Sequence, residues 1–413
     1  MTALGYPIYL HYLGFERYGV WIVLSTVLSF VQLTNLGIGP AVTSYVAAEH
    51  AAGRTGGVQR YATTAVCAVT SLGLLVVAVV YSVRHAIVAA FKVSGPNAES
   101  AQALVPFVAL LSVYVFVVQV HSATIAGLGR MDLSATIDAV GRIVALLVST
   151  LLLVGGLRLE AMLVGSVFSY VVVHTATSLV LVRGFRLSIL RVRSFSLTAL
   201  RDLLRFGAGI IGSSILVLLL HPSNRLIVAR SSGVASLPVY EIAFSAAMQI
   251  RSLLESGFRA IAPEVGRLAS RTRQQMWSAC TRMAKRSTAL VLVLGAPAWL
   301  VLWAVAIPAF KLWLGQRYMP ELPAAFRAML VGTYCGLLGV PWYYILIGLR
   351  RTDTVFAHHL LQTISNAVAL FAISLSGTIA PLDAAVAASF GMAVANLYLA
   401  MKGRRAVEEL ACA

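Results

Sequence analysis

Four arginines and three carboxylates stand inside long apolar stretches of this sequence, where a charged side chain needs a partner, a cavity or water. They are Arg142, Arg225, Arg251, Arg259, Asp138, Glu241 and Glu255. Guanidinium groups suit phosphate and other anions, and a carboxylate in such a place can accept a proton or bind Na+. We therefore expect the arginines to bind an anionic substrate, and the carboxylates are candidate coupling groups for H+ or Na+.

The stretch 238–262 carries the densest group of these residues. At about 100° per residue, its polar side chains fall within about a third of the helix circumference. This stripe consists of Glu241, Met248, Arg251, Ser252, Glu255 and Arg259. Glu255 lies four residues from both Arg251 and Arg259, so ion pairs within the helix are available. The stripe is either a cavity wall that holds a pyrophosphate or a structural ladder of ion pairs.

The remaining ionisable residues also have two interpretations each. Asp138 and Arg142 are four residues apart and are expected to pair, either for packing and gating or as a ligand site. Arg225 follows Pro222, which interrupts an apolar helix, and such breaks are tolerated where a helix lines a cavity. Arg225 either binds substrate phosphate or sugar, or extends to the outer interface.

Two positions predict a change of helix direction. Gly37, Gly39 and Pro40 break the apolar stretch 18–48, and Pro222 breaks the later one. Each break is interpreted as either a hinge for alternating access or a static kink.

Composition indicates the class of protein that positions these residues. Of the 413 residues, 59% are hydrophobic and only 11% are charged, and the mean hydropathy is +0.86. A soluble enzyme or a disordered chain would need far more charge, and four scattered cysteines exclude a secreted disulfide scaffold. The chain is therefore predicted to be an all-α polytopic membrane protein. It has no phosphate-binding loop and no metal-ligand spacing, so we expect no enzyme activity, metal or cofactor.

Hydropathy predicts about 12 transmembrane helices, at about 20 apolar residues for each span. The expected ranges are 1–12, 18–48, 60–83, 103–127, 133–154, 160–183, 206–230, 238–262, 284–308, 324–348, 354–376 and 382–401. The first is too short to cross a bilayer, since about 12 helical residues reach only about 18 Å. We expect this truncated helix to reflect a missing upstream segment or a misplaced start codon.

The net charge of +17 is better explained by membrane topology than by a nucleic acid partner. If the N-terminus is cytoplasmic and the spans alternate, most of the 32 lysines and arginines fall on the cytoplasmic side. This distribution predicts that both termini are cytoplasmic. It also predicts that the basic residues contact anionic membrane lipid and that no nucleic acid is bound.

A polar stretch from Arg183 to Arg205, with six arginines and one acid, divides the chain into two halves. It predicts an N-terminal transmembrane lobe (1–183), a basic cytoplasmic linker (184–205) and a C-terminal transmembrane lobe (206–413), each lobe with six helices. The halves share a short outer turn with an early glycine and a tyrosine that opens the next helix. Repeated halves with a substrate site between them are a common plan of transporters.

Several short motifs resemble those of a known family. The strongest stand near the start: Pro7-Ile8-Tyr9-Leu10, Leu13-Gly14-Phe15-Glu16-Arg17-Tyr18-Gly19-Val20-Trp21 and Asn35-Leu36-Gly37-Ile38-Gly39. Weaker matches are Asn224-Arg225 followed by Gly233, and Leu312-Trp313-Leu314-Gly315 with Tyr318. With the layout of spans, they resemble bacterial Wzx-type oligosaccharide flippases of the multidrug/oligosaccharidyl-lipid/polysaccharide exporter superfamily.

The resemblance implies two lobes around a central cavity that alternates between the two membrane faces. It implies a lipid-linked oligosaccharide as substrate, an undecaprenyl-pyrophosphate sugar unit for O-antigen or exopolysaccharide. It also implies a place in the bacterial inner (cytoplasmic) membrane, with other polysaccharide-assembly membrane proteins as partners. Members of this family often carry Asp where this chain has Asn35 and Asn224. Both differences remove a cation acceptor and argue against cation coupling through these sites.

Two alternative functions stay open. A cation-coupled multidrug extruder of the same fold would need an acidic cavity, but four arginines stand against three acids inside the predicted spans. A membrane-embedded glycan polymerase or ligase would need an external Arg/His cluster, for which the predicted outer loops are too short. A flippase for a lipid-linked oligosaccharide therefore fits the sequence best.

Overall fold

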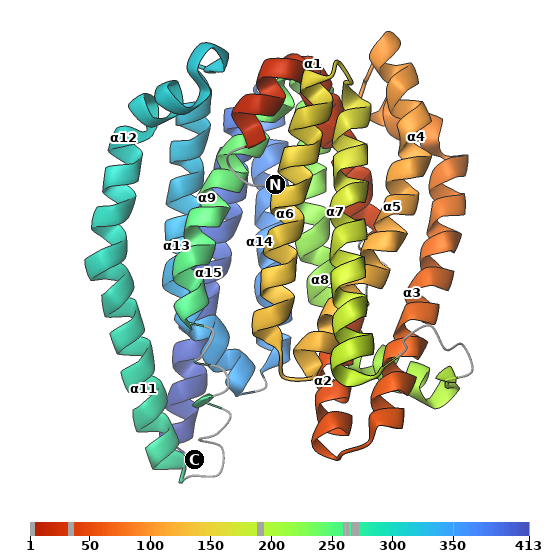
Figure 1. Cartoon of the computed structure of the whole chain (residues 1–413). Coiled ribbons are helices and arrows are strands. Elements are labelled where there is room, and N and C mark those ends of the chain that lie inside the picture. Colours follow the sequence, from red (N-terminus) through yellow and green to blue (C-terminus); the bar gives the residue numbers. More distant parts are fainter. Residues whose placement is uncertain are drawn as a thin grey trace. The chain divides into compact units, whose positions relative to one another are not determined.

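The computed structural model describes residues 5–31, 37–187, 194–258, 261, 264–265, 272–349 and 351–412 (Figure 1). Within these ranges all regular structure is helical and there is no β-strand. The prediction of an all-α polytopic fold is confirmed for this part of the chain. The chain divides into two compact units, Met1–Pro222 and Ser223–Ala413.

The N-terminal unit is built from long helices and one short helix. They are α1 (Gly5–Val31), α2 (Ile38–Ala51), α3 (Thr55–Ser82), α4 (Arg84–Ala90), α5 (Pro96–Gly127), α6 (Met131–Val154), α7 (Leu159–Leu179) and the first part of α8 (Leu197–Ser232). In Figure 1, α3 lies beside α5 and α6 beside α7. Helix α5 provides much of the core, including the fully buried Phe116 and Ile125.

Helix α1 contains the break that the sequence placed between its first two spans. Gly14 has φ 70° and ψ 178°, a backbone conformation that suits glycine and kinks the helix. The remainder of α1 is lined by buried Val20, Ile22 and Leu24. Gly14 thus separates two helical segments within α1, at the place where the sequence predicts the boundary between its first two spans.

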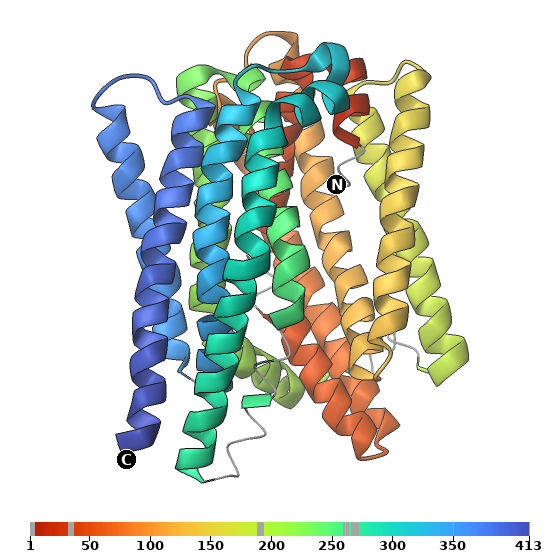
Figure 2. The same cartoon turned by 90° about the vertical axis from the view of Figure 1, so that its left-hand side faces the viewer.

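The C-terminal unit begins within α8, after Pro222. It contains α9 (Leu237–Phe258), α11 (Arg273–Leu290), a π-helical turn at Val291–Gly295, α12 (Ala296–Leu314), α13 (Leu322–Gly348), α14 (Thr352–Ser374) and α15 (Pro381–Cys412). Helix α13 is central to this unit because it packs against both α9 and α15. Figure 2 shows α14 and α15 side by side.

Eight helical segments of the described chain are long and apolar enough to cross a membrane. They are Thr55–Ser82, Pro96–Gly127, Met131–Val154, Leu159–Gly184, Gln274–Arg317, Leu322–Gly348, Asp353–Ser374 and Pro381–Glu409. Each coincides with a predicted span. The predicted spans at 206–230 and 238–262 correspond to α8 and α9, and α4 is a short helix that the hydropathy did not predict.

The boundary between the two compact units follows Pro222 in the sequence, which is further along the chain than the predicted linker at 184–205. Residues 197–205 are the first turns of α8, and Asp202 in this segment contacts α3. The Tyr61 hydroxyl donates to Asp202 Oδ2 at 2.9 Å, and the Ser196 N–H donates to Thr64 Oγ1 at 3.1 Å. Leu203 is fully buried. These contacts join the described end of the basic segment to the N-terminal unit.

Three glycines on one face of α13 allow close packing within the C-terminal unit. Gly332, Gly336 and Gly339 follow a spacing of four and three residues, which places them on one side of a helix. A Cβ atom at Gly332 would lie 2.4 Å from the Ser389 Cα of α15. A Cβ atom at Gly339 would lie 2.1 Å from the Asn396 side chain of the same helix. The short distance between α13 and α15 therefore depends on glycine, which has no side chain, at these positions.

Gly332→Ala is expected to destabilise the protein by about 1–3 kcal/mol, because the opposing atom is helix backbone that cannot rotate away. Thermal unfolding of the purified protein in detergent measures the effect. Gly257→Ala on α9 is the matched control, since an added Cβ there meets nothing and alanine favours the helix by about 1 kcal/mol or less. Equal melting temperatures for the two variants would contradict this account of the α13–α15 contact.

Candidate functional site

A buried ion pair connects α8 and α9 in the C-terminal unit. Arg225 Nη2 and Nε lie 2.7 and 2.9 Å from the same oxygen, Glu241 Oε2. Ser245, one turn after Glu241, donates to Glu241 Oε1 at 3.2 Å. The two charged side chains are only 8% and 12% exposed. Each charge therefore compensates the other, which a low-dielectric environment requires.

An amide network lies beside this pair. Asn224 Nδ2 donates to Asn366 Oδ1 at 3.2 Å, and Asn366 Nδ2 donates back to Asn224 Oδ1 at 2.9 Å. Asn224 Nδ2 also donates to the Tyr240 hydroxyl at 3.0 Å. All three side chains are buried, so the network fixes α8, α9 and α14 together. Asn224 thus has a structural role here, in the place where the resembling flippases often carry Asp.

The predicted stripe on α9 is formed in part. Arg251 Nε lies 3.3 Å from Glu255 Oε2, and the Tyr344 hydroxyl of α13 donates to Glu255 Oε1 at 3.3 Å. Gly336 makes room for the guanidinium group, because a Cβ there would lie 2.8 Å from Arg251 Nη1. The predicted Arg251–Glu255 pair is confirmed, and Arg259 lies outside the described residues.

Asp138 and Arg142 of the N-terminal unit lie one turn apart on α6. They interact electrostatically, but within the described chain they form no direct ion pair. Arg142 is exposed and lines a cavity of about 160 Å3 between α1, α6 and α7. The other lining residues are Tyr9, Ala145, Leu146, Ser149, Met162, Ser166, Ser169 and Tyr170. Arg142 therefore lies at the edge of a polar cavity and does not form the expected direct ion pair with Asp138.

The sequence did not predict this cavity. Arg142 and Ser149 are seven residues apart on α6, and Ser166 and Tyr170 are four apart on α7, so each pair shares a helix face. Hydroxyl groups that recur on the same helix face as an arginine are the sequence pattern that could have indicated a polar cavity. The residue that closes the cavity from α1, Tyr9, carries no such signal because nothing in the sequence places it next to α6.

Histidines far apart in the sequence are also brought together. The rings of His121 on α5 and His174 on α7 have centroids 4.8 Å apart, and Tyr114 stacks on His174 at 5.5 Å. In the C-terminal unit, His358 Nδ1 lies 2.9 Å from the Ala395 carbonyl oxygen. Among the described residues there is no group of three His, Cys, Asp or Glu side chains that could hold a metal ion.

The predicted hinge residues lie at two different places, at the start of α2 and inside α8. Gly37 has φ 75° and stands directly before α2, so Gly39 and Pro40 lie in the first turn of that helix. Pro222 lies inside α8, at the division between the compact units. Whether these breaks move during transport stays a prediction. Asn35 lies outside the described residues.

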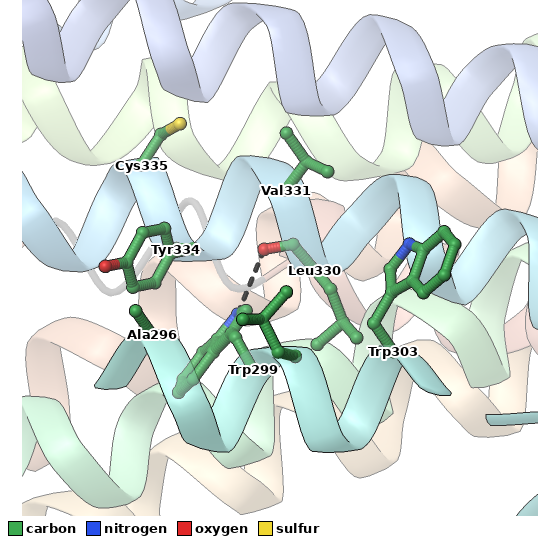
Figure 3. A pocket seen from close by; sticks show the side chains of 8 residues that line it. Ala296, Trp299, Trp303, Leu330, Val331, Tyr334 and Cys335 are labelled. Atoms are coloured by element: carbon green, nitrogen blue, oxygen red, sulfur yellow. Dashed lines mark hydrogen bonds between the residues drawn. The ribbon is translucent and has the colours of Figure 1, made fainter. Parts of the chain in front are cut away.

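A second cavity, of about 440 Å3, lies between α12 and α13 (Figure 3). Its lining is apolar and aromatic, with Trp299, Trp303 and Tyr334 around Leu330. The Trp299 Nε1–H donates to the Leu330 carbonyl oxygen at 3.0 Å, which fixes the indole against α13. Among the described residues that line this cavity none is charged, so its lining does not suit the anionic substrate that the arginines suggest.

Solved structures of transporters share this fold. The inward-facing conformation of a multidrug resistance MATE family transporter of the MOP superfamily has a TM-score of 0.83 at 15% identity, covering 98% of this chain and 94% of that chain. The outward-facing conformation of such a transporter has a TM-score of 0.67 at 14% identity, covering 99% and 92%. The crystal structure of MATE in the bent conformation gives 0.64 at 15% identity, covering 99% and 94%.

The helices and these likenesses define a multi-pass membrane protein with a transporter fold. Residues 12–323 match the polysaccharide biosynthesis protein family, and the chain belongs to that family. Both the family and the fold are those of transporters rather than of enzymes. No curated protein matches the chain.

Glu241→Gln is expected to lower the stability of the protein by about 3 kcal/mol, because it removes the carboxylate that pairs with the buried Arg225 guanidinium. The double variant Arg225→Gln/Glu241→Gln removes both charges and is expected to recover most of that loss. Thermal unfolding of the three proteins measures the difference. A double variant that is less stable than Glu241→Gln would contradict the compensation argument.

Proposed function

We propose that this protein translocates a lipid-linked oligosaccharide across the bacterial cytoplasmic membrane by alternating access. The substrate is an undecaprenyl-pyrophosphate sugar unit for O-antigen or exopolysaccharide assembly. Membership of the polysaccharide biosynthesis family and the transporter fold support this proposal. The positive-inside distribution of arginines supports an orientation with both termini in the cytoplasm.

The observation that favours this function over drug extrusion is the state of the intramembrane charges. The two candidate coupling carboxylates of the C-terminal unit, Glu241 and Glu255, lie against arginines. Arg142 is exposed beside hydroxyl groups and forms no direct ion pair within the described chain. A cationic drug needs an acid that is not already neutralised, whereas an anionic substrate needs an available guanidinium. Two of the three intramembrane carboxylates are neutralised in this way, and the third, Asp138, lies one turn from Arg142. The balance of these charges therefore favours an anion.

Cation coupling, if it uses a carboxylate, is assigned to Asp138. Protonation of Glu241 or Glu255 would weaken an existing ion pair, whereas Asp138 has no direct ion pair within the described chain. Asp138 also lies one turn from Arg142, so its charge affects the attraction of Arg142 for an anion.

The leaflet distribution of the lipid-linked oligosaccharide tests the function. An impermeant lectin or glycosidase, applied to spheroplasts, is expected to detect a smaller outer-leaflet pool when the gene is deleted. The full-length chain is expected to restore that pool. If the pool is unchanged and the efflux of cationic dyes falls instead, the protein is a drug extruder.

The coupling role predicts a separate outcome. Asp138→Asn is expected to remove the dependence of the outer-leaflet pool on the proton gradient, as measured with and without a protonophore. Asp132→Asn is the matched control on the same helix, since Asp132 is exposed and pairs with Arg130 at 3.1 Å. A pool that still responds to the protonophore in Asp138→Asn would exclude Asp138 as the coupling group.

A further inference from the structure

The cavity between α1, α6 and α7 has an arginine at its edge and hydroxyl groups at its base. Arg142 is exposed, whereas Ser149 and Ser169 are only 3% and 7% exposed. Tyr9 closes the cavity from α1 and interacts with Ser149. The cavity is therefore a recess with a charged entrance and an interior lined with polar atoms, inside a segment that is otherwise apolar.

Two close helix contacts hold the serines in place. A Cβ at Gly141 would lie 2.4 Å from Val173 Cγ2, and a Cβ at Gly165 would lie 2.0 Å from Ser149 Oγ. Glycine at both positions lets α6 and α7 approach closely. The Ser169 hydroxyl consequently reaches across the hairpin and donates to the Gly141 carbonyl oxygen at 2.7 Å.

Two hydroxyl protons of the cavity, those of Ser166 and Ser169, are already used in hydrogen bonds to the backbone. Ser169 donates to Gly141, and Ser166 donates to the Met162 carbonyl oxygen at 2.8 Å. The oxygens of Ser166 and Ser169 therefore offer acceptor lone pairs to a ligand. The Arg142 guanidinium offers donors only. The recess thus matches a ligand that has several hydroxyl donors and one anionic acceptor.

Size and charge narrow the ligand class. A volume of about 160 Å3 corresponds to about five water molecules at about 30 Å3 each, and it is smaller than the about 300–1,000 Å3 of complete ligand sites. The recess fits one sugar ring rather than an oligosaccharide. A pyrophosphate would need more positive charge than one guanidinium with a carboxylate, Asp138, one turn away.

We propose that this recess binds one acidic sugar residue of the substrate. Arg142 binds the carboxylate of that residue, and Ser166 and Ser169 accept hydrogen bonds from its hydroxyl groups. The proposal rests on the proposed function and gives it a substrate class, oligosaccharides that contain a uronic acid or a similarly acidic sugar.

Binding of two simple glycosides to the full-length protein tests the proposal. Methyl β-D-glucuronide and methyl β-D-glucoside differ only in the acidic group, and saturation-transfer-difference NMR in phosphatidylcholine nanodiscs measures both. The wild-type protein is expected to bind the glucuronide about tenfold or more tightly, as a hydrogen bond to a charged group implies. Arg142→Gln is expected to bring the two affinities to within about twofold, because it removes the charge and keeps the serines.

Matched variants separate the site from general damage. Arg158→Gln carries the same substitution in the exposed turn between α6 and α7, and it is expected to keep the preference. Ser166→Leu fills the recess and is expected to abolish binding of both glycosides, whereas Val167→Leu on the exposed face is expected to keep it. The proposal is wrong if Arg142→Gln keeps the preference for the glucuronide, or if inorganic phosphate displaces the glucuronide at an equal concentration.

The result is distinguishable from a failure of the proposed function. If the purified protein binds neither glycoside but the gene is needed for the outer-leaflet pool, the sugar recess is refuted and the flippase function stands. If the glucuronide binds as expected but gene deletion leaves the pool unchanged, the recess stands as a sugar site and the flippase function is refuted.

Discussion

Charge compensation in a medium without water is the constraint on which this structure depends. Arg225 and Glu241 illustrate it, since neither side chain is stable alone at such low exposure, and together they connect α8 to α9. The neighbouring amide network of Asn224 and Asn366 extends the connection to α14 without any charge. An unpaired polar group would destabilise the protein inside the hydrocarbon region. Because these groups pair with one another, their contacts specify one arrangement of the helices.

Close helix contact is the second requirement, because in a membrane the hydrophobic effect does not drive helices together. Glycines supply it in both compact units. On α13 they admit both α15 and the guanidinium group of Arg251, and in the α6–α7 hairpin they bring the serines within reach of the opposite backbone. The same small residues that permit packing therefore also decide which polar side chains become available to a ligand.

The sequence predicted the helices well and the site in part. Long apolar stretches predicted the fold class and nearly every helix, because hydropathy reads length and polarity directly. The Arg251–Glu255 pair also followed from helical spacing. The Arg225–Glu241 pair did not, since it joins residues 16 positions apart on different helices, and the direct Asp138–Arg142 pair did not form despite favourable spacing. The recess on α6 needed Tyr9, which only the folded chain brings close.

The reciprocal hydrogen bonds of Asn224 and Asn366 have a consequence for the history of this protein. A mutation at either position leaves a donor or an acceptor of the other without its partner. The two positions are therefore expected to covary among relatives. Asp at position 224, frequent in the flippases that the motifs resemble, would turn a donor into an acceptor. Tyr240 and Asn366 would then both have to donate to residue 224. A change between Asn and Asp at this position therefore requires that the hydrogen bond between residue 224 and Tyr240 reverse its direction.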